Sequence, residues 1–170
     1  MAISMYQASV PSFVRSLEST KKFLKKGEAY AKAKDISPEV LLNCRLMADM
    51  LPLTRQIQIA SDAAKGAGAR LSGIEIPSFA DNEKSFADLY KRIDKTVKFL
   101  NKIKPEKMDG AEDKIITIQI PKKTIKFSGL IYLTQFAIPN FSFHTVTAYN
   151  ILRHNGVKIG KLDFLGGIPK

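Results

Sequence analysis

The two histidines of the chain, His144 and His154, lie close together in the stretch "NFSFHTVTAYNILRHNG". Imidazole is the side chain best suited to proton transfer and metal binding near neutral pH, so this stretch is the first place to look for chemistry. His144 follows Phe141 by three residues and precedes Ala148 by four, a spacing that predicts a core-facing position on a helix. It is either part of a site between facing helices or a core histidine satisfied by one carbonyl or hydroxyl.

His154 is predicted to have a different role from His144. It is ten residues further along and would be rotated by roughly 80° on a helix of ~3.6 residues per turn. It also stands just before "NG", a sequence typical of helix ends, where a histidine caps carbonyls and interacts with the helix dipole. Asn140, four residues before His144, is expected to line the same cavity as His144.

Four further polar residues complete the candidate pocket. If adjacent helices pair antiparallel, Asp49 is the acid expected nearest His144, and a metal, if one binds, would use His144 and Asp49. Arg55 and Gln56 could reach the cavity and bind an anionic ligand, although Arg55 could instead pair with Asp49 or another acid. Tyr149 is divided between packing and hydrogen bonding.

The strongest catalytic motifs do not occur in the sequence. It contains no HxxxH, HExxH, P-loop, GxSxG or GxGxxG pattern. The single cysteine, Cys44, cannot form an internal disulfide and is interpreted as a small buried hydrophobe.

Helices must position these residues. Apolar residues at helical spacing predict a first helix from Ser4 or Ser9 through Leu24, and Ser37-Pro38 begins a short helical segment. A second long helix is expected to begin between Asp49 and Pro52 and to end at Gly73, and a third covers residues 86–103.

The alternation in "KIITIQIPKKTIKF" predicts a β-hairpin, after which helical spacing returns from Ser128, with a kink at Pro139. This order predicts a mainly all-α protein, an antiparallel four-helix bundle with a small hairpin between its third and fourth helices, in one domain over residues 1–170. The apolar tail after Gly156 is expected to pack on the bundle or on a second subunit.

The composition limits the partners. A net charge of +11 would attract anions, but the lysines lie in three separate segments and repeat along one side of the third helix, which favours a solvated face over a nucleic-acid surface. Nucleic-acid binding is therefore not expected. No apolar run could span a membrane, and the N-terminus lacks a secretory signal pattern, so we expect a cytoplasmic protein.

Three long stretches carry a family resemblance: "MYQASVPSFVRSL", "LPLTRQIQIASDAAKGAGARLSGIEIPSF" and "NFSFHTVTAYNILRHNGVKIGKLDFLG". They resemble a family of small uncharacterised bacterial and fungal proteins, known as a domain of unknown function. That family is similar in fold to the DinB/YfiT-like superfamily of four-helix bundles. The resemblance covers nearly the whole chain and implies the same fold.

The resemblance also implies what the site lacks. In metal-binding DinB-like relatives, one histidine of the second helix and an HxxxH pair on the last helix hold a divalent metal. His144 matches the first position of that pair, Ala148 occupies the second, and the second helix has no histidine. The three-histidine site is therefore incomplete, and no tightly bound catalytic metal is expected.

The resulting functional hypothesis is a DinB-like bundle that binds a small molecule in an internal pocket around His144, Asn140 and Asp49. One alternative is a divergent thiol or group transferase, whose metal (Zn or Ni) would be held by His144 and Asp49 and completed by water or substrate. A second is a basic protein that binds nucleic acid or anionic surfaces. Because superfamily members often dimerise, the resemblance also implies a homodimer.

Overall fold

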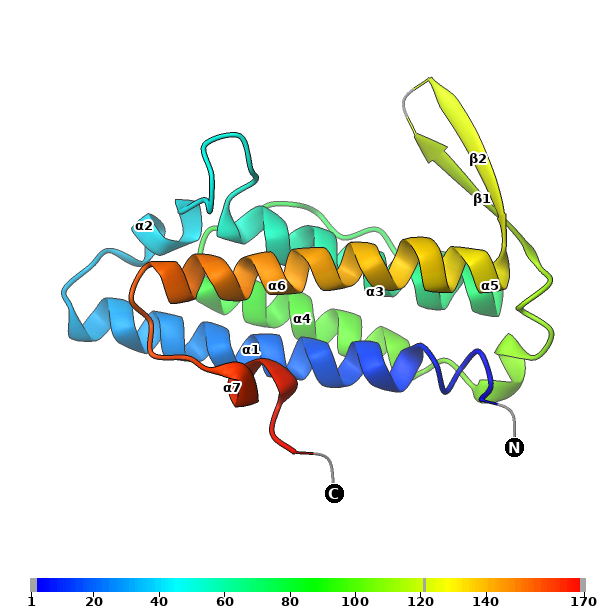
Figure 1. Ribbon diagram of the computed structural model, residues 1–170, viewed down its shortest axis with the longest axis horizontal. Helices are drawn as coiled ribbons and strands as arrows, with labels where there is room; N and C mark the ends of the chain where they lie inside the picture. Colours follow the sequence, from blue (N-terminus) through cyan, green and yellow to red (C-terminus); the bar gives the residue numbers. More distant parts are fainter. Residues whose placement is uncertain (1–2, 121, 169–170) are drawn as a thin grey trace.

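The computed structural model describes residues 3–120 and 122–168. Four long helical elements lie side by side (Figure 1), and short elements connect them or extend from them. The long elements are α1 (Val10–Ala33), α3 (Leu53–Ser72), α4 (Phe86–Leu100) and a composite of α5 (Gly129–Ile131), η2 (Tyr132–Ala137) and α6 (Ile138–His154). The short ones are α2 (Pro38–Asn43), η1 (Pro105–Met108), α7 (Lys161–Leu165) and the hairpin strands β1 (Ile115–Ile120) and β2 (Lys123–Ser128).

The helices pair antiparallel as α1 with α4 and α3 with α6. Lys21 meets Asp94 while the later Glu28 meets the earlier Tyr90, which fixes the opposite directions of α1 and α4. The connection 74–85 returns along the length of the bundle (Figure 1), so α3 and α4 run in the same direction. The predicted four-helix bundle is confirmed, and its antiparallel pairs are not the pairs that follow each other directly in the chain.

The helix boundaries follow from local sequence. Ser4 and Gln7 exchange hydrogen bonds in a turn of their own, and α1 then begins at Val10 with Pro11 in its first turn, where no N–H is needed. Gly73 ends α3 in the left-handed conformation, with φ of 73°. The Ser85 hydroxyl accepts a hydrogen bond from the Asp88 N–H at 3.1 Å and so caps α4.

The core lies on the axis shared by the four long helices. Leu17, Ile57, Ile93 and Leu152, one from each helix, are fully buried. Burying each such side chain contributes about 1.5–3 kcal/mol relative to exposure. The apolar periodicity of the sequence thus describes the inward faces correctly.

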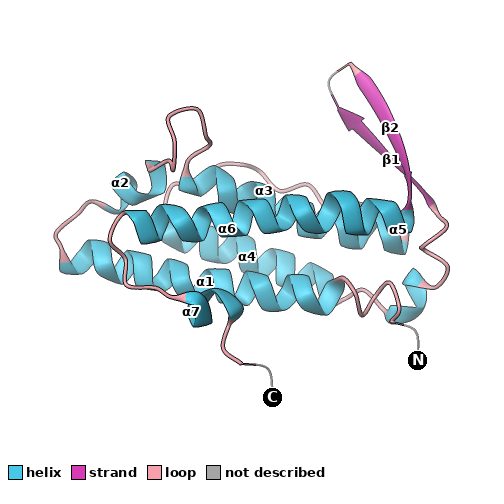
Figure 2. Cartoon of the chain, in the orientation of Figure 1, coloured by secondary structure: helices cyan, strands magenta, loops and turns pink. Residues whose placement is uncertain are grey.

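The hairpin departs from the bundle near the start of α5, and its strands are the only strands in the described part of the chain (Figure 2). Ile116 and Ile118 are buried, and Phe127 packs on Tyr132 and Phe136, so one face of the hairpin is held against the last helix. Pro121, predicted in the turn, lies outside the described residues.

The C-terminal segment packs back on its own bundle, one of the two predicted alternatives. Arg15 of α1 donates hydrogen bonds to the carbonyls of Leu165 and Gly167, and Lys26 pairs with Asp163 at 2.6 Å. In the described residues, none of the helices has the length and apolar character that crossing a membrane requires.

Candidate functional site

His144 is positioned by Gln56. The antiparallel packing of α3 and α6 brings the Gln56 amide oxygen within 2.6 Å of His144 Nδ1. The amide nitrogen of Gln56 donates to the carbonyl of Leu51 at 2.8 Å, which fixes the orientation of the amide. Because an amide oxygen only accepts hydrogen bonds, Nδ1 carries the proton and Nε2 has a free lone pair.

The imidazole is suited to a neutral role. Burial lowers the pKa of His144, since the charged form loses its hydration, and this favours the uncharged ring at neutral pH. The ring lies edge-on to the exposed Phe143, at 5.2 Å between centroids. His144 can therefore accept a hydrogen bond, or a proton, through Nε2.

The surroundings of His144 do not supply a three-residue metal site. Gln56, not Asp49, is the hydrogen-bonding partner of His144, and Asp49 is exposed in the loop before α3. Ala148, one turn further along α6, offers no donor atom. Within residues 3–120 and 122–168, no group of three His, Cys, Asp or Glu side chains is placed to hold a metal ion. A neutral amide and one imidazole do not fit the superfamily's metal.

The other predicted residues are dispersed. Arg55 donates to Gln58 and Asp81, each at 2.6 Å, so its acidic partner is Asp81 and not Asp49. The Tyr149 hydroxyl donates to the carbonyl of Ile159 at 3.4 Å, and its ring packs between Phe23 and Phe164. His154 is exposed at the end of α6, as predicted for a residue in the last turn.

Asn140 lines a pocket on the outer side of the α3–α6 contact, which we name the seam pocket. Its volume is about 200 Å³. The lining residues come from α3, β1, η2 and α6: Ile59, Asp62, Ala63, Arg70, Ile118, Tyr132, Phe136, Ala137 and Asn140. His144 is not among them, although it lies one helical turn beyond Asn140, about 5.4 Å along the axis.

A π-helical segment, Tyr132–Ala137, forms one wall of the seam pocket. Pro139 has no N–H to donate to the carbonyl four residues earlier, and its ring would collide with that carbonyl in a regular α-helix. The wider π turn directly before Pro139 relieves this conflict. Such segments are frequent at functional sites.

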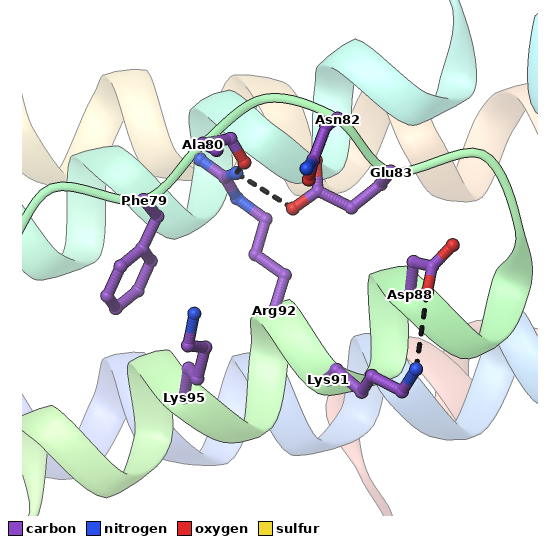
Figure 3. Close-up of a pocket in the computed structure, with 8 residues that line it drawn as sticks. All are labelled: Phe79, Ala80, Asn82, Glu83, Asp88, Lys91, Arg92 and Lys95. Atoms are coloured by element: carbon purple, nitrogen blue, oxygen red, sulfur yellow. Dashed lines mark hydrogen bonds and ion pairs between the residues drawn. The ribbon is translucent and has the colours of Figure 1, made fainter.

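A second polar cluster, which sequence reasoning missed, surrounds Arg92 of α4 (Figure 3). The side chain is 1% exposed and forms ion pairs with Asp62 at 3.0 Å, Asp81 at 3.0 Å and Glu83 at 2.9 Å. It also donates to the carbonyl of Ala80 at 3.1 Å. We name Arg92 with these three acids the Arg92 cluster.

The signal for this cluster was the spacing of Arg92 itself. It follows Leu89 by three residues and precedes Thr96 by four, and both are fully buried, so Arg92 lies on the inner face of α4. Because lysines on the solvated face of the same helix lie close to Arg92 in sequence, Arg92 was not recognised as a buried residue. The cluster ties the connection 74–85 to α3 and α4.

A pocket of about 330 Å³ adjoins the Arg92 cluster (Figure 3). Phe79 forms one side of it and is surrounded by cations: Lys65 Nζ lies 4.1 Å and Lys95 Nζ 4.9 Å from the ring centroid. Burial alone would raise the pKa of Asp81, but hydrogen bonds and charge from Arg55 and Arg92 outweigh it and lower that pKa. Each acid of the Arg92 cluster is paired with at least one cation, which is the arrangement of a structural clamp.

The bundle with its returning connection and hairpin defines a DinB-like helical protein. The chain is similar to the crystal structure of a DinB family member protein from Shewanella denitrificans, with a TM-score of 0.89 and 38% sequence identity. The match covers 98% of this chain and 94% of the other. Comparison with curated proteins finds no match.

The particular family follows from residues 5–165, which match the domain of unknown function DUF1993. The chain belongs to this family. The predicted resemblance to an uncharacterised, DinB-like family is thereby confirmed.

Proposed function

We propose that this protein binds a small molecule in the seam pocket and does so without a resident catalytic metal. The observation that carries the proposal is the composition of the pocket. Four polar side chains, those of Asp62, Arg70, Tyr132 and Asn140, lie among five apolar lining residues. Small-molecule sites typically combine an apolar wall with a small number of placed polar groups.

The size of the seam pocket limits its ligand. Its volume of about 200 Å³ lies below the ~300–1,000 Å³ of typical ligand clefts. A compact molecule, or one end of a larger molecule, fits this space. We therefore propose a ligand site beside Asn140, on the outer side of the α3–α6 contact, in place of the internal pocket around His144, Asn140 and Asp49 that the sequence suggested.

The hydrogen bond between Gln56 and His144 supports the proposal that no catalytic metal is resident at His144. Both functional atoms of the Gln56 amide are already hydrogen-bonded, to His144 Nδ1 and to the Leu51 carbonyl. A transferase mechanism based on a metal held by His144 and Asp49 would need an acid that is instead exposed to solvent. We propose that His144 serves as a neutral hydrogen-bond acceptor beside the pocket.

The basic surface gives little support to nucleic-acid binding. Several lysines of the predicted basic segments are paired with acids, among them Lys21 with Asp94 and Lys26 with Asp163. A surface that binds the phosphate backbone of a nucleic acid needs unpaired cations clustered on one face. Binding that falls steeply with added salt would favour this alternative.

We further propose that the chain forms a homodimer through α6. Phe143 is 55% exposed and Val146, three residues later on the same side of the helix, is 40% exposed. Sedimentation of the wild type and of a Phe143→Ser variant tests this. A monomeric wild type at tens of micromolar would contradict the assembly.

The ligand proposal is tested with ¹⁵N-labelled, untagged protein and two neutral probes, benzamide and 3-methylbutanamide. We expect the side-chain amide signals of Asn140 to shift on titration. Ala63→Leu, which fills the pocket, should abolish the shift, whereas Ala29→Leu, on the exposed side of α1, should not. No shift at Asn140, or equal shifts in both variants, would overturn the proposal.

The metal content of the purified protein tests whether a catalytic metal is resident. We expect the untagged protein to contain well below one equivalent of zinc, nickel or manganese by mass spectrometry. A stoichiometric metal that is lost in His144→Ala would overturn it.

A further inference from the structure

We propose that the seam pocket selects a small monocarboxylate with an apolar body, and that Arg70 is the residue that binds its carboxylate. This inference rests on the proposed function, because it names the chemical class of the ligand for the same pocket. It is carried by the way the fold holds one arginine at the pocket wall.

Arg70 is held in place from two sides. Its Nη1 donates to the Tyr132 hydroxyl at 3.2 Å, and its guanidinium lies 5.9 Å from the centroid of the Tyr132 ring. On α3 itself, the guanidinium folds back over Gly66, where a Cβ would collide with Nη1. A glycine one turn earlier therefore makes room for the arginine head, which the tyrosine then orients.

The charge of Arg70 is uncompensated in the described residues, where it makes no ion pair. In this it differs from Arg92, which pairs with three acids, and from Arg55, which pairs with Asp81. Arg15 and Arg153 also lack an ion pair among the described residues, but neither lines the seam pocket. The guanidinium is half-buried and lines a pocket. A planar fork of donors that lacks a carboxylate in such a place matches the geometry of a ligand carboxylate.

Tyr132 adds a second donor. Its oxygen accepts the hydrogen bond from Arg70, which leaves its own hydrogen free to donate to a ligand. Burial raises the pKa of Tyr132 despite the opposing effect of Arg70, so the hydroxyl keeps its proton at neutral pH. One oxygen of a carboxylate could thus contact Arg70 and the other Tyr132.

The remaining lining favours a singly charged, apolar ligand. Asp62 lies at the same pocket, and its Oδ1 is engaged by Lys65 at 2.8 Å and Arg92 at 3.0 Å. Its negative charge would oppose a dianion such as a phosphate more strongly than a monoanion. Ile59, Ile118 and Phe136 offer apolar contact for the body of the ligand.

The experiment compares each acid with its own amide. Benzoate and 3-methylbutanoate are titrated into the full-length protein beside benzamide and 3-methylbutanamide, with the Asn140 amide and the Arg70 Nε–H as NMR reporters. We expect each acid to bind at least tenfold more tightly than its amide. Inorganic phosphate is expected to cause no saturable shift at these signals.

Three variants locate the effect at Arg70. Arg70→Met should weaken the binding of both acids by about ten- to a hundredfold and leave the amides unchanged, in keeping with a lost charge-assisted pair. Gly66→Ala, which displaces the guanidinium, should weaken the acids in the same direction. Arg153→Met, a change of equal charge at an exposed position of α6, should have no effect.

The outcomes separate the two proposals. If amides and acids bind equally well and Arg70→Met changes neither, the carboxylate inference fails while the proposed function stands. If no probe of either class shifts Asn140, both fail. Acid binding that is reduced equally by Arg153→Met would show general charge attraction and would also overturn the inference.

Discussion

Replacing Arg92 by methionine gives the sharpest test of how this fold is held together. Methionine keeps an unbranched apolar side chain of similar reach beside Phe79 but removes the guanidinium. The change would leave Asp62, Asp81 and Glu83 close together without their shared cation. Breaking a buried ion pair in this way costs about 3–5 kcal/mol, because the abandoned charge stays poorly hydrated.

The solvent exposure of the three acids determines where in this range the loss of unfolding free energy should lie. The side chains of Asp62 and Asp81 are 43% and 39% exposed, so water can solvate them again, and each should contribute about 0–1 kcal/mol. Only Glu83, at 8% exposure, is left buried. We therefore expect a loss near the lower end, about 3 kcal/mol, equivalent to about 6–12 °C in Tm for a chain of this length.

The assay is urea denaturation followed by circular dichroism at pH 7. Lys91→Met is the matched control, since Lys91 precedes Arg92 on α4, is 77% exposed and makes only a 3.4 Å contact with Asp88. It should change the unfolding free energy by no more than about 0.5 kcal/mol. If Arg92→Met costs less than about 1 kcal/mol, or no more than Lys91→Met, the Arg92 cluster does not anchor the connection 74–85.

Three further predictions concern other parts of the bundle. The NMR signals of the His144 ring should titrate with a midpoint below pH 6.5, and a midpoint at or above 6.5 would contradict this. Because the unfolded chain binds this proton more readily than the folded protein, the unfolding free energy should fall as the pH drops from 6.5 toward the folded pKa. Gln56→Glu places a carboxylate against Nδ1 and should raise the pKa of His144, seen as a higher midpoint in the same titration. An unchanged midpoint would show that the 2.6 Å contact is not maintained in solution. Gly129→Ala should destabilise the fold by more than about 1 kcal/mol in urea, since a Cβ there meets the Ala111 carbonyl, while Gly160→Ala, in open space, should cost far less.

The sequence was sufficient to predict the elements but not the lengthwise offset between them. Apolar periodicity located α3 and α4 to within a few residues, and Gly73 and the alternating isoleucines marked a helix end and a hairpin. It predicted the end of the first helix too early, because α1 continues from Leu24 to Ala33. It did not identify the partner of His144. The position of Asp49 depends on the path of the loop before α3, which leaves Asp49 in solvent. Gln56, in the first turn of α3, contacts the imidazole instead.

Long-range polar contacts were equally hidden from periodicity. Arg92 is flanked by lysines, and its acids Asp81 and Glu83 belong to a connection with no regular structure. Arg70 was not a candidate, because its significance depends on Gly66 beneath it and on Tyr132 across the pocket. The role of each arginine depends on whether an acid lies beside it, as for Arg92, or not, as for Arg70. This is determined by the packing of segments that are distant in sequence.

The returning connection between α3 and α4 also bears on how the chain acquires its structure. In a bundle whose successive helices pair, each helix finds its partner after a short loop, and such local contacts fold fast. Here α1 pairs with α4, and α3, although it also packs on α4, has its most extensive contact with α6, on the far side of the hairpin. During synthesis the apolar faces of α1 and α3 are therefore exposed until much later residues emerge, so this protein should fold more slowly than a simple up-and-down bundle of equal length and should depend more on protection of the nascent chain.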